Sequence, residues 1–214
     1  MPSRQEVPRA VLSLGWLGVS LGAAQGRMHE VQLGPVAGIT LAQFGGSDTK
    51  GRNVDTRTGF LVGGVATIRV HRHVAIEPQA FYLQKGAEYT AGVRARVKLD
   101  YVEVPVLLKI LLPPRKEPEL RPYFAVGPAL AFKARCKLNF ASGGVSVSED
   151  CKDEDVDAKG TDFSLLFAAG VAVRRLTFGL HYDLGLSTVD GSTNPVDLKN
   201  RVAGFSIGYG FRLG

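Results

Sequence analysis

The stretch Asp100–Leu111, DYVEVPVLLKIL, alternates two kinds of side chain along its whole length. Its even positions after Asp100 are aliphatic: Val102, Val104, Val106, Leu108 and Ile110. Its odd positions include both ionisable side chains and a ring: Tyr101, Glu103, Pro105, Leu107 and Lys109. A period of two is typical of a β-strand, because successive side chains point to opposite faces of the sheet. The aliphatic face belongs either on a protein core or, in a membrane barrel, on lipid.

Seven further segments of the chain have the same alternation. They are residues 33–44, 57–70, 74–85, 121–133, 162–174, 176–187 and 201–213. The clearest is 176–187, in which Leu, Phe and Tyr alternate with Thr, Gly, His, Asp and Ser without a break. Each segment has the roughly ten residues that a tilted strand needs to cross a bilayer. The sequence therefore predicts eight strands, and no helical period competes with them.

The connections between these segments differ in length at the two ends of the predicted sheet. Long polar connections follow the first, third, fifth and seventh strands, at 45–56, 86–96, 134–161 and 188–200. Tight ones follow the second and sixth strands, at 71–73 and 174–175, whereas LPPRKEPEL at 112–120 is a longer turn. Short turns at one end and long loops at the other are typical of outer-membrane barrels.

The distribution of charge decides between the soluble and the membrane alternatives. A soluble barrel around an apolar ligand would point aliphatic side chains inward and spread its charges outward. Here the aliphatic register is nearly free of charge over all eight segments, and the opposite register is small or ionisable. We therefore predict an all-β fold, an eight-stranded antiparallel up-and-down transmembrane β-barrel.

The N-terminus has the pattern of a secretory signal. Residues 1–9 are polar with two arginines, 10–21 are apolar, and Gly22, Ala23 and Ala24 are small residues suited to cleavage. We expect a signal peptide over 1–24 and a barrel domain over 25–214; a buried first helix is the alternative. No later segment is long and apolar enough for a spanning helix.

Two compositional features bear on partners and on redox state. The net charge is +6, but the basic residues are scattered, which argues against a nucleic-acid partner. Cys136 and Cys151 lie in one polar region, and export would place them where disulfides persist. We expect a bridge between them across a hairpin that extends the fifth and sixth strands, and no metal site.

Four pieces of the chain resemble the outer-membrane β-barrel domain of PorT-like bacterial proteins. They are EPQAFYLQKGAEY at 77–89, LDYVEVPVLLKI at 99–110, RPYFAVGPALAF at 121–132 and FSIGYGFRL at 205–213. The resemblance implies a place in the bacterial outer membrane, with membrane lipid and the barrel-insertion machinery as partners. The last piece also resembles the C-terminal insertion signal, in which Ser206, Gly208, Phe211 and Leu213 hold the expected places, although the chain ends in Gly214.

The inward register contains Lys85 and seven further ionisable residues, and these seven are the candidate site. They are Arg69, Glu77, Glu103, Lys109, His181, Asp183 and Arg212. An eight-stranded barrel has room only for side chains, so we expect a packed ionic network in which Glu103 pairs with Lys109, Arg69 or Arg212.

Function is less determined than fold. We expect no enzyme, no cofactor and no catalytic residue, but a structural or surface-recognition role through the long loops, with the ligand unidentified. One alternative is a narrow pore or transporter. Another is a lipid hydrolase that uses His181 and Asp183 with a serine such as Ser164.

Overall fold

A computed structural model describes residues 30–46, 54–91, 93–114, 120–142, 145–150, 159–192 and 197–213. Strands and their short connections account for these residues. Within the described ranges, no helix has the length and apolarity to cross a membrane.

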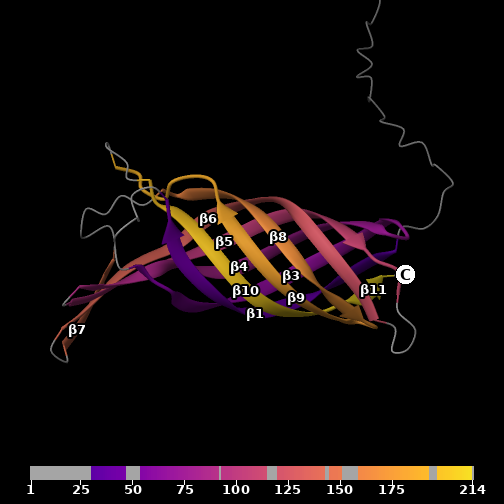
Figure 1. The fold of residues 1–214 in the computed structure, drawn as a ribbon, viewed down its shortest axis with the longest axis horizontal. Helices are drawn as coiled ribbons and strands as arrows, with labels where there is room; N and C mark the ends of the chain where they lie inside the picture. Colours follow the sequence, from indigo (N-terminus) through magenta and orange to yellow (C-terminus); the bar gives the residue numbers. More distant parts are fainter. Residues whose placement is uncertain are drawn as a thin grey trace, which may run out of the picture.

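The described strands form one closed antiparallel sheet, as Figure 1 shows. Eight long strands, called staves below, form the wall of the barrel: β1 (Val31–Gly45), β3 (Arg57–His71), β4 (Val74–Ala91), β5 (Val93–Leu111), β6 (Leu120–Ser142), β8 (Thr161–Val173), β9 (Leu176–Gly185) and β10 (Lys199–Tyr209). Each stave pairs with the next one along the chain, and β10 pairs with β1, for example Phe205 with Ile39. The predicted eight-stranded up-and-down barrel is confirmed.

Three short strands complete the sheet. They are β2 (Val54–Asp55), which pairs with β4, β7 (Val145–Asp150), which pairs with β6, and β11 (Phe211–Leu213), which pairs with β1 beyond the end of β10. The β6–β7 pairing is the hairpin expected beyond the fifth strand.

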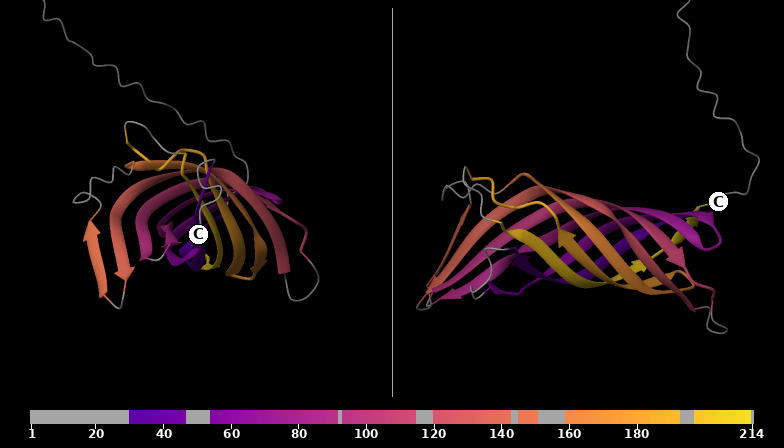
Figure 2. Two further views of the ribbon diagram at one scale, coloured as in Figure 1. Left: turned by 60° about the vertical axis from the view of Figure 1, so that its left-hand side comes forward. Right: turned by 45° about the horizontal axis from the view of Figure 1, so that its top comes forward.

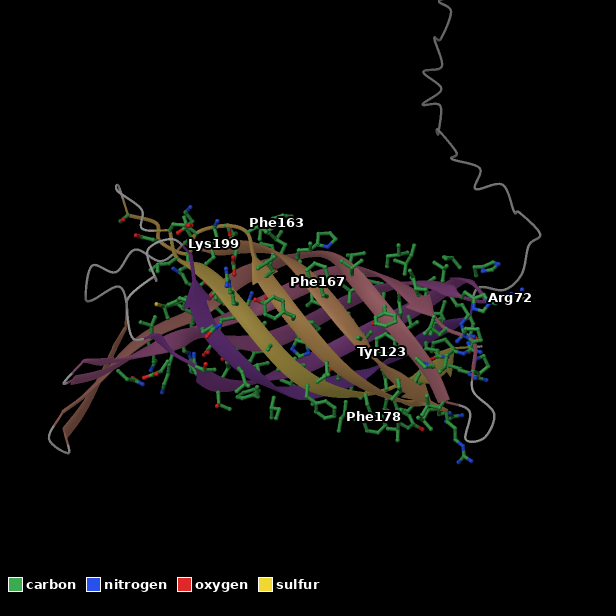
Figure 3. The ribbon with its side chains drawn as sticks, viewed as in Figure 1. Arg72, Tyr123, Phe163, Phe167, Phe178 and Lys199 are labelled. Carbon is green, nitrogen blue, oxygen red and sulfur yellow. The ribbon has the colours of Figure 1, made fainter. Side chains whose placement is uncertain are left out.

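The barrel is apolar outside. On β5, Val102 and Val104 are 43% and 41% exposed, whereas Tyr101 and Glu103 between them are fully buried. The same alternation holds on the other staves, and Figure 3 labels three outer phenylalanines, Phe163, Phe167 and Phe178. So large an exposed apolar band marks a surface that meets lipid, which answers the question raised by the Asp100–Leu111 stretch.

The two ends of the barrel differ as predicted, but the long connections are more regular than expected. β3 joins β4 through Arg72 and His73, and β8 joins β9 through Arg174 and Arg175. At the other end, β4 and β5 stay paired out to Ala91 and Val93, so 86–96 is a hairpin ladder and not a polar loop. These strands project beyond the barrel at the left of Figure 1 and in both views of Figure 2.

The lumen is largely filled, and beside the small and ionisable side chains that dominate the predicted inner register it contains large apolar ones. One cluster at its middle contains Phe81, Leu107, Tyr123 and Leu166, together with smaller alanines. A second cluster closes the end that carries the hairpins: Phe44, Leu99, Tyr101, Ala131 and Val189. Val189 comes from the connection after β9 and is tied there by backbone hydrogen bonds to Lys159 and Leu198.

The outward facing of β9 can be tested at Leu180, which is 65% exposed in the apolar band. Leu180→Arg should destabilise the inserted barrel by about 2–4 kcal/mol, because arginine near the bilayer midplane loses its hydration. Unfolding by urea in lipid vesicles, followed by far-ultraviolet circular dichroism, measures the loss. Leu180→Met is the matched control and should stay close to the parent; equal stability of all three proteins would contradict the assigned facing.

Candidate functional site

Four charged side chains meet inside the barrel and form what we call the Lys85 cluster: Lys85, Glu103, Asp162 and Asp183. The Lys85 Nζ lies 2.6 Å from Glu103 Oε2, 2.7 Å from Asp183 Oδ2 and 3.3 Å from Asp162 Oδ2. These residues come from β4, β5, β8 and β9, and all four are essentially inaccessible to solvent. One lysine thus joins four staves across the lumen.

Neighbouring groups hold Asp162 in place. Ser187 Oγ donates to Asp162 Oδ1 at 2.9 Å, and Asn200 Nδ2 donates to Asp162 Oδ2 at 2.8 Å. The strand register puts Ala131 of β6 between Glu103 and Asp162 in the same row of the sheet. Because alanine is short, the carboxylates on either side of it can both reach the lysine.

The cluster works as a fixed closure of the lumen. Buried charges cost several kcal/mol each unless they are paired and hydrogen-bonded, so these side chains hold one another in one arrangement. The apolar cluster of Phe44, Leu99 and Val189 covers the same end of the barrel. Charge pairing and apolar packing together leave that end shut.

A second ion pair lies nearer the tight-turn end. Lys109 Nζ is 2.6 Å from Glu77 Oε2, and it also lies 4.1 Å from the ring centre of Tyr123. Glu77 accepts further hydrogen bonds from Thr67 Oγ1 and from Gln79 Nε2, each at 2.8 Å. This carboxylate is therefore satisfied on both oxygens by three different side chains.

A third group stands at the tight-turn mouth of the barrel. Glu30 receives Arg69 Nη1 at 2.7 Å and Arg212 Nε at 3.0 Å. The side chain of Arg212 is 67% exposed, so this group belongs to the rim and not to the lumen. It ties the start of the described chain to β3 and β11.

A cavity of about 80 Å³ lies within the lumen, lined in part by Glu77, Lys109, Tyr123 and His181. The His181 ring has room there because Gly204, its partner on β10, has no side chain. A Cβ at Gly204 would stand 2.4 Å from His181 Nε2. The cavity therefore depends on a glycine on the neighbouring stave.

The structure corrects the expected partner of Glu103. Glu103 pairs with Lys85 and not with Lys109, Arg69 or Arg212; Lys109 binds Glu77, and the two arginines bind Glu30. Sequence reasoning placed Lys85 in the inward register but left it and Asp162 out of the network. Both residues alternate in step with the inward-facing positions of their strands, and this was the signal available in the sequence. The strand tilt that brings them to one height along the barrel axis could not be inferred from the sequence.

The hydrolase alternative finds no assembled triad. Ser164 Oγ, His181 Nε2 and Asp183 Oδ1 are buried and have no hydrogen-bond partner among the described residues. Asp183 instead uses its other oxygen to bind Lys85. A search of the same residues finds no group of three His, Cys, Asp or Glu side chains that could hold a metal ion.

Several other predictions remain open. The signal peptide over 1–24 lies outside the described residues, and so does Cys151, so the disulfide stays a prediction. The β6–β7 register pairs Lys137 with Asp150. In the sequence, Cys136 directly precedes Lys137 and Cys151 directly follows Asp150. Of the predicted insertion signal, Phe211 and Leu213 are more than half exposed on β11, while Ser206 and Gly208 belong to the inward register of β10.

The Lys85 cluster contains one cation and three carboxylates, and this imbalance leads to a prediction about stability. Lys85→Met leaves three buried carboxylates without their cation and should destabilise the barrel by about 3–5 kcal/mol. Glu103→Gln should cost clearly less, because Lys85 keeps Asp162 and Asp183. Urea unfolding in detergent micelles measures both; a larger loss for Glu103→Gln than for Lys85→Met would contradict the central place of the lysine.

Comparison with known proteins agrees with this architecture. The OprG outer membrane protein of Pseudomonas aeruginosa matches over 87% of this chain and 98% of its own, with 10% identity and a TM-score of 0.50. The attachment invasion locus protein Ail of Yersinia pestis matches over 86% and 100%, with 16% identity and a TM-score of 0.45. A comparison with curated protein sequences finds no match. The family model of the outer membrane protein beta-barrel domain matches residues 23–191, and the chain therefore belongs to this family of bacterial outer-membrane barrels.

Proposed function

We propose that this protein is a closed, non-enzymatic barrel that anchors surface-recognition hairpins in the outer membrane. The observation that carries the proposal is the Lys85 cluster, in which one buried lysine binds three carboxylates across the lumen. A barrel closed in this way holds its staves rigidly and offers no continuous path for a solute. The strand extensions at the hairpin end of the barrel are then the part that carries surface recognition.

The orientation of the barrel follows from its two unlike ends. Barrels of this class keep short turns in the periplasm and long connections outside the cell. The turns at Arg72–His73 and Arg174–Arg175 therefore face the periplasm, and the β4–β5 and β6–β7 hairpins face outward. Because these hairpins continue the ladder of the barrel, they are suited to present a surface in a fixed position.

Two further proposals rest on the sequence. The four PorT-like pieces, of which 99–110 and 121–132 are fairly specific together, support membership of the PorT-like branch of the family. The C-terminal residues Ser206, Gly208, Phe211 and Leu213 serve as the signal for the insertion machinery, and the exposed aromatic and aliphatic side chains of β11 favour that role.

The orientation can be tested by epitope insertion. A short tag between Ser142 and Val145, in the β6–β7 hairpin, should be stained by antibody on intact cells. The same tag between Arg174 and Arg175 is the matched control and should be stained only after the outer membrane is permeabilised. The reverse pattern would overturn the orientation.

The closed lumen can be tested by electrical recording. The purified barrel in a planar lipid bilayer should give no stepwise conductance, because the Lys85 cluster and the apolar cluster above it fill one end. A general porin added afterwards to the same bilayer serves as the positive control. Reproducible small steps before that addition would support the narrow-pore alternative instead.

A further inference from the structure

A basic hollow lies on the outer wall of the barrel at its hairpin end, and its volume is about 510 Å³. Four of the side chains that line it are cationic: Arg57, Lys98, Arg135 and Lys137. Among the described residues that line it, Asp100 is the single acidic one. The hollow therefore carries an excess of positive charge.

The strand register shows where the hollow lies relative to the apolar band along the barrel axis. Tyr82, Val102 and Phe132 form one row across β4, β5 and β6; on the lipid-facing side Val102 and Phe132 are exposed and Tyr82 is half-buried. The next row toward the hairpin end is Gln84, Asp100 and Arg135, and in the row beyond it Lys98 pairs with Lys137. The outer surface thus changes from apolar to polar within one row and becomes basic at the row of Lys98 and Lys137.

A β-bulge on β6 produces this change. Lys133 pairs with Tyr101 and Arg135 pairs with Asp100, so Ala134 is the extra residue. An extra residue reverses which side chains of a strand face outward. Without it, Arg135 and Lys137 would belong to the inward register of β6, as Ala129 and Ala131 do.

The floor of the hollow is preorganised. The buried Arg57 donates through Nη1 to the backbone carbonyl of Lys85, and its Nη2 lies 3.8 Å from Asp100 Oδ1. Tyr82 Oη donates to Asp100 Oδ2 at 2.6 Å. Gly86 has a φ of +115°, and a Cβ there would stand 3.3 Å from Arg57 Nη1, so the glycine leaves room for the guanidinium.

We propose that this hollow binds the phosphate group of a glycolipid in the outer leaflet of the membrane. Guanidinium and ammonium groups are the usual partners of phosphate, and the planar fork of arginine matches phosphate oxygens in pairs. A tyrosine at the boundary is typical of the level at which lipid headgroups begin. The proposal rests on the orientation proposed above, which places this wall in the outer leaflet.

The position of the hollow favours a lipid over a free solute. Three of its lining residues, Gln84, Asp100 and Arg135, form the row next to Tyr82 and Phe132 and share their outward-facing register. A lipid whose acyl chains lie along the apolar band would therefore bring its headgroup to the cations.

Native mass spectrometry of the folded barrel in detergent tests the site. The probes are a diphosphorylated, acylated glucosamine disaccharide and the same lipid without phosphate. The test variant is Lys98→Gln/Arg135→Gln/Lys137→Gln, and the matched control is Arg72→Gln/Arg174→Asn/Arg175→Gln, which removes the same charge from the tight-turn end. Far-ultraviolet circular dichroism establishes that every variant is folded.

The parent and the control should bind the phosphorylated lipid equally, and the test variant should bind it at least about tenfold more weakly. Arg135→Lys, which keeps the charge but loses the fork, should fall between them. Equal binding by the test variant, an equal loss in the control, or equal binding of the lipid without phosphate would overturn the proposal. So would inorganic phosphate at millimolar concentration that displaces the lipid fully, because the ligand would then be the free anion.

These outcomes are separate from those of the proposed function. Binding in detergent does not depend on orientation, whereas the epitope experiment reports orientation without lipid. A barrel that binds the lipid but shows the reversed epitope pattern would keep the phosphate site and lose its placement in the outer leaflet.

Discussion

The need to pair every backbone amide and carbonyl within hydrocarbon governs this molecule. A sheet with free edges cannot lie in lipid, so the first and last staves must meet, and β1 does pair with β10 from Val36 to Gly45 and with β11 from Val31 to Leu33. Closure with eight staves then sets the diameter, and the diameter leaves an interior that side chains fill. The inverted pattern of the sequence, aliphatic outside and ionisable inside, follows from that closure.

The narrow interior explains why the charges inside are organised as they are. Each inward carboxylate must find a cation or several donors, and the staves offer both in different places. At the hairpin end, Lys85 binds three carboxylates, and Ser187 and Asn200 donate to one of them, Asp162. Toward the tight turns, Lys109 and two neutral donors satisfy Glu77, and a cavity remains beside them. The lumen is therefore tightly packed at the hairpin end and looser toward the tight turns.

The staves β4, β5 and β6 combine several roles because they are the longest. Their inner faces carry Lys85, Glu103 and Lys109, their outer faces carry the apolar band, and their extensions make the hairpins. One bulge at Ala134 turns β6 over where the apolar band ends, so that arginine and lysine take the outward places that phenylalanine held below. The bulge in β6 therefore lies at the level where the apolar band ends.

The alternation of side chains was enough to determine the number of strands, their facing and the unlike ends of the barrel, because these depend on a period of two that lipid and lumen enforce residue by residue. It also placed several ionisable residues inside, including Glu103 and Lys109. Tertiary structure alone decided which charges meet: strand tilt carries Lys85 of β4 to the height of Asp162 and Asp183, which are 77 and 98 residues away in the chain. It also decided the outward position of Arg135, because a bulge depends on how two strands pair and leaves no mark in either strand by itself.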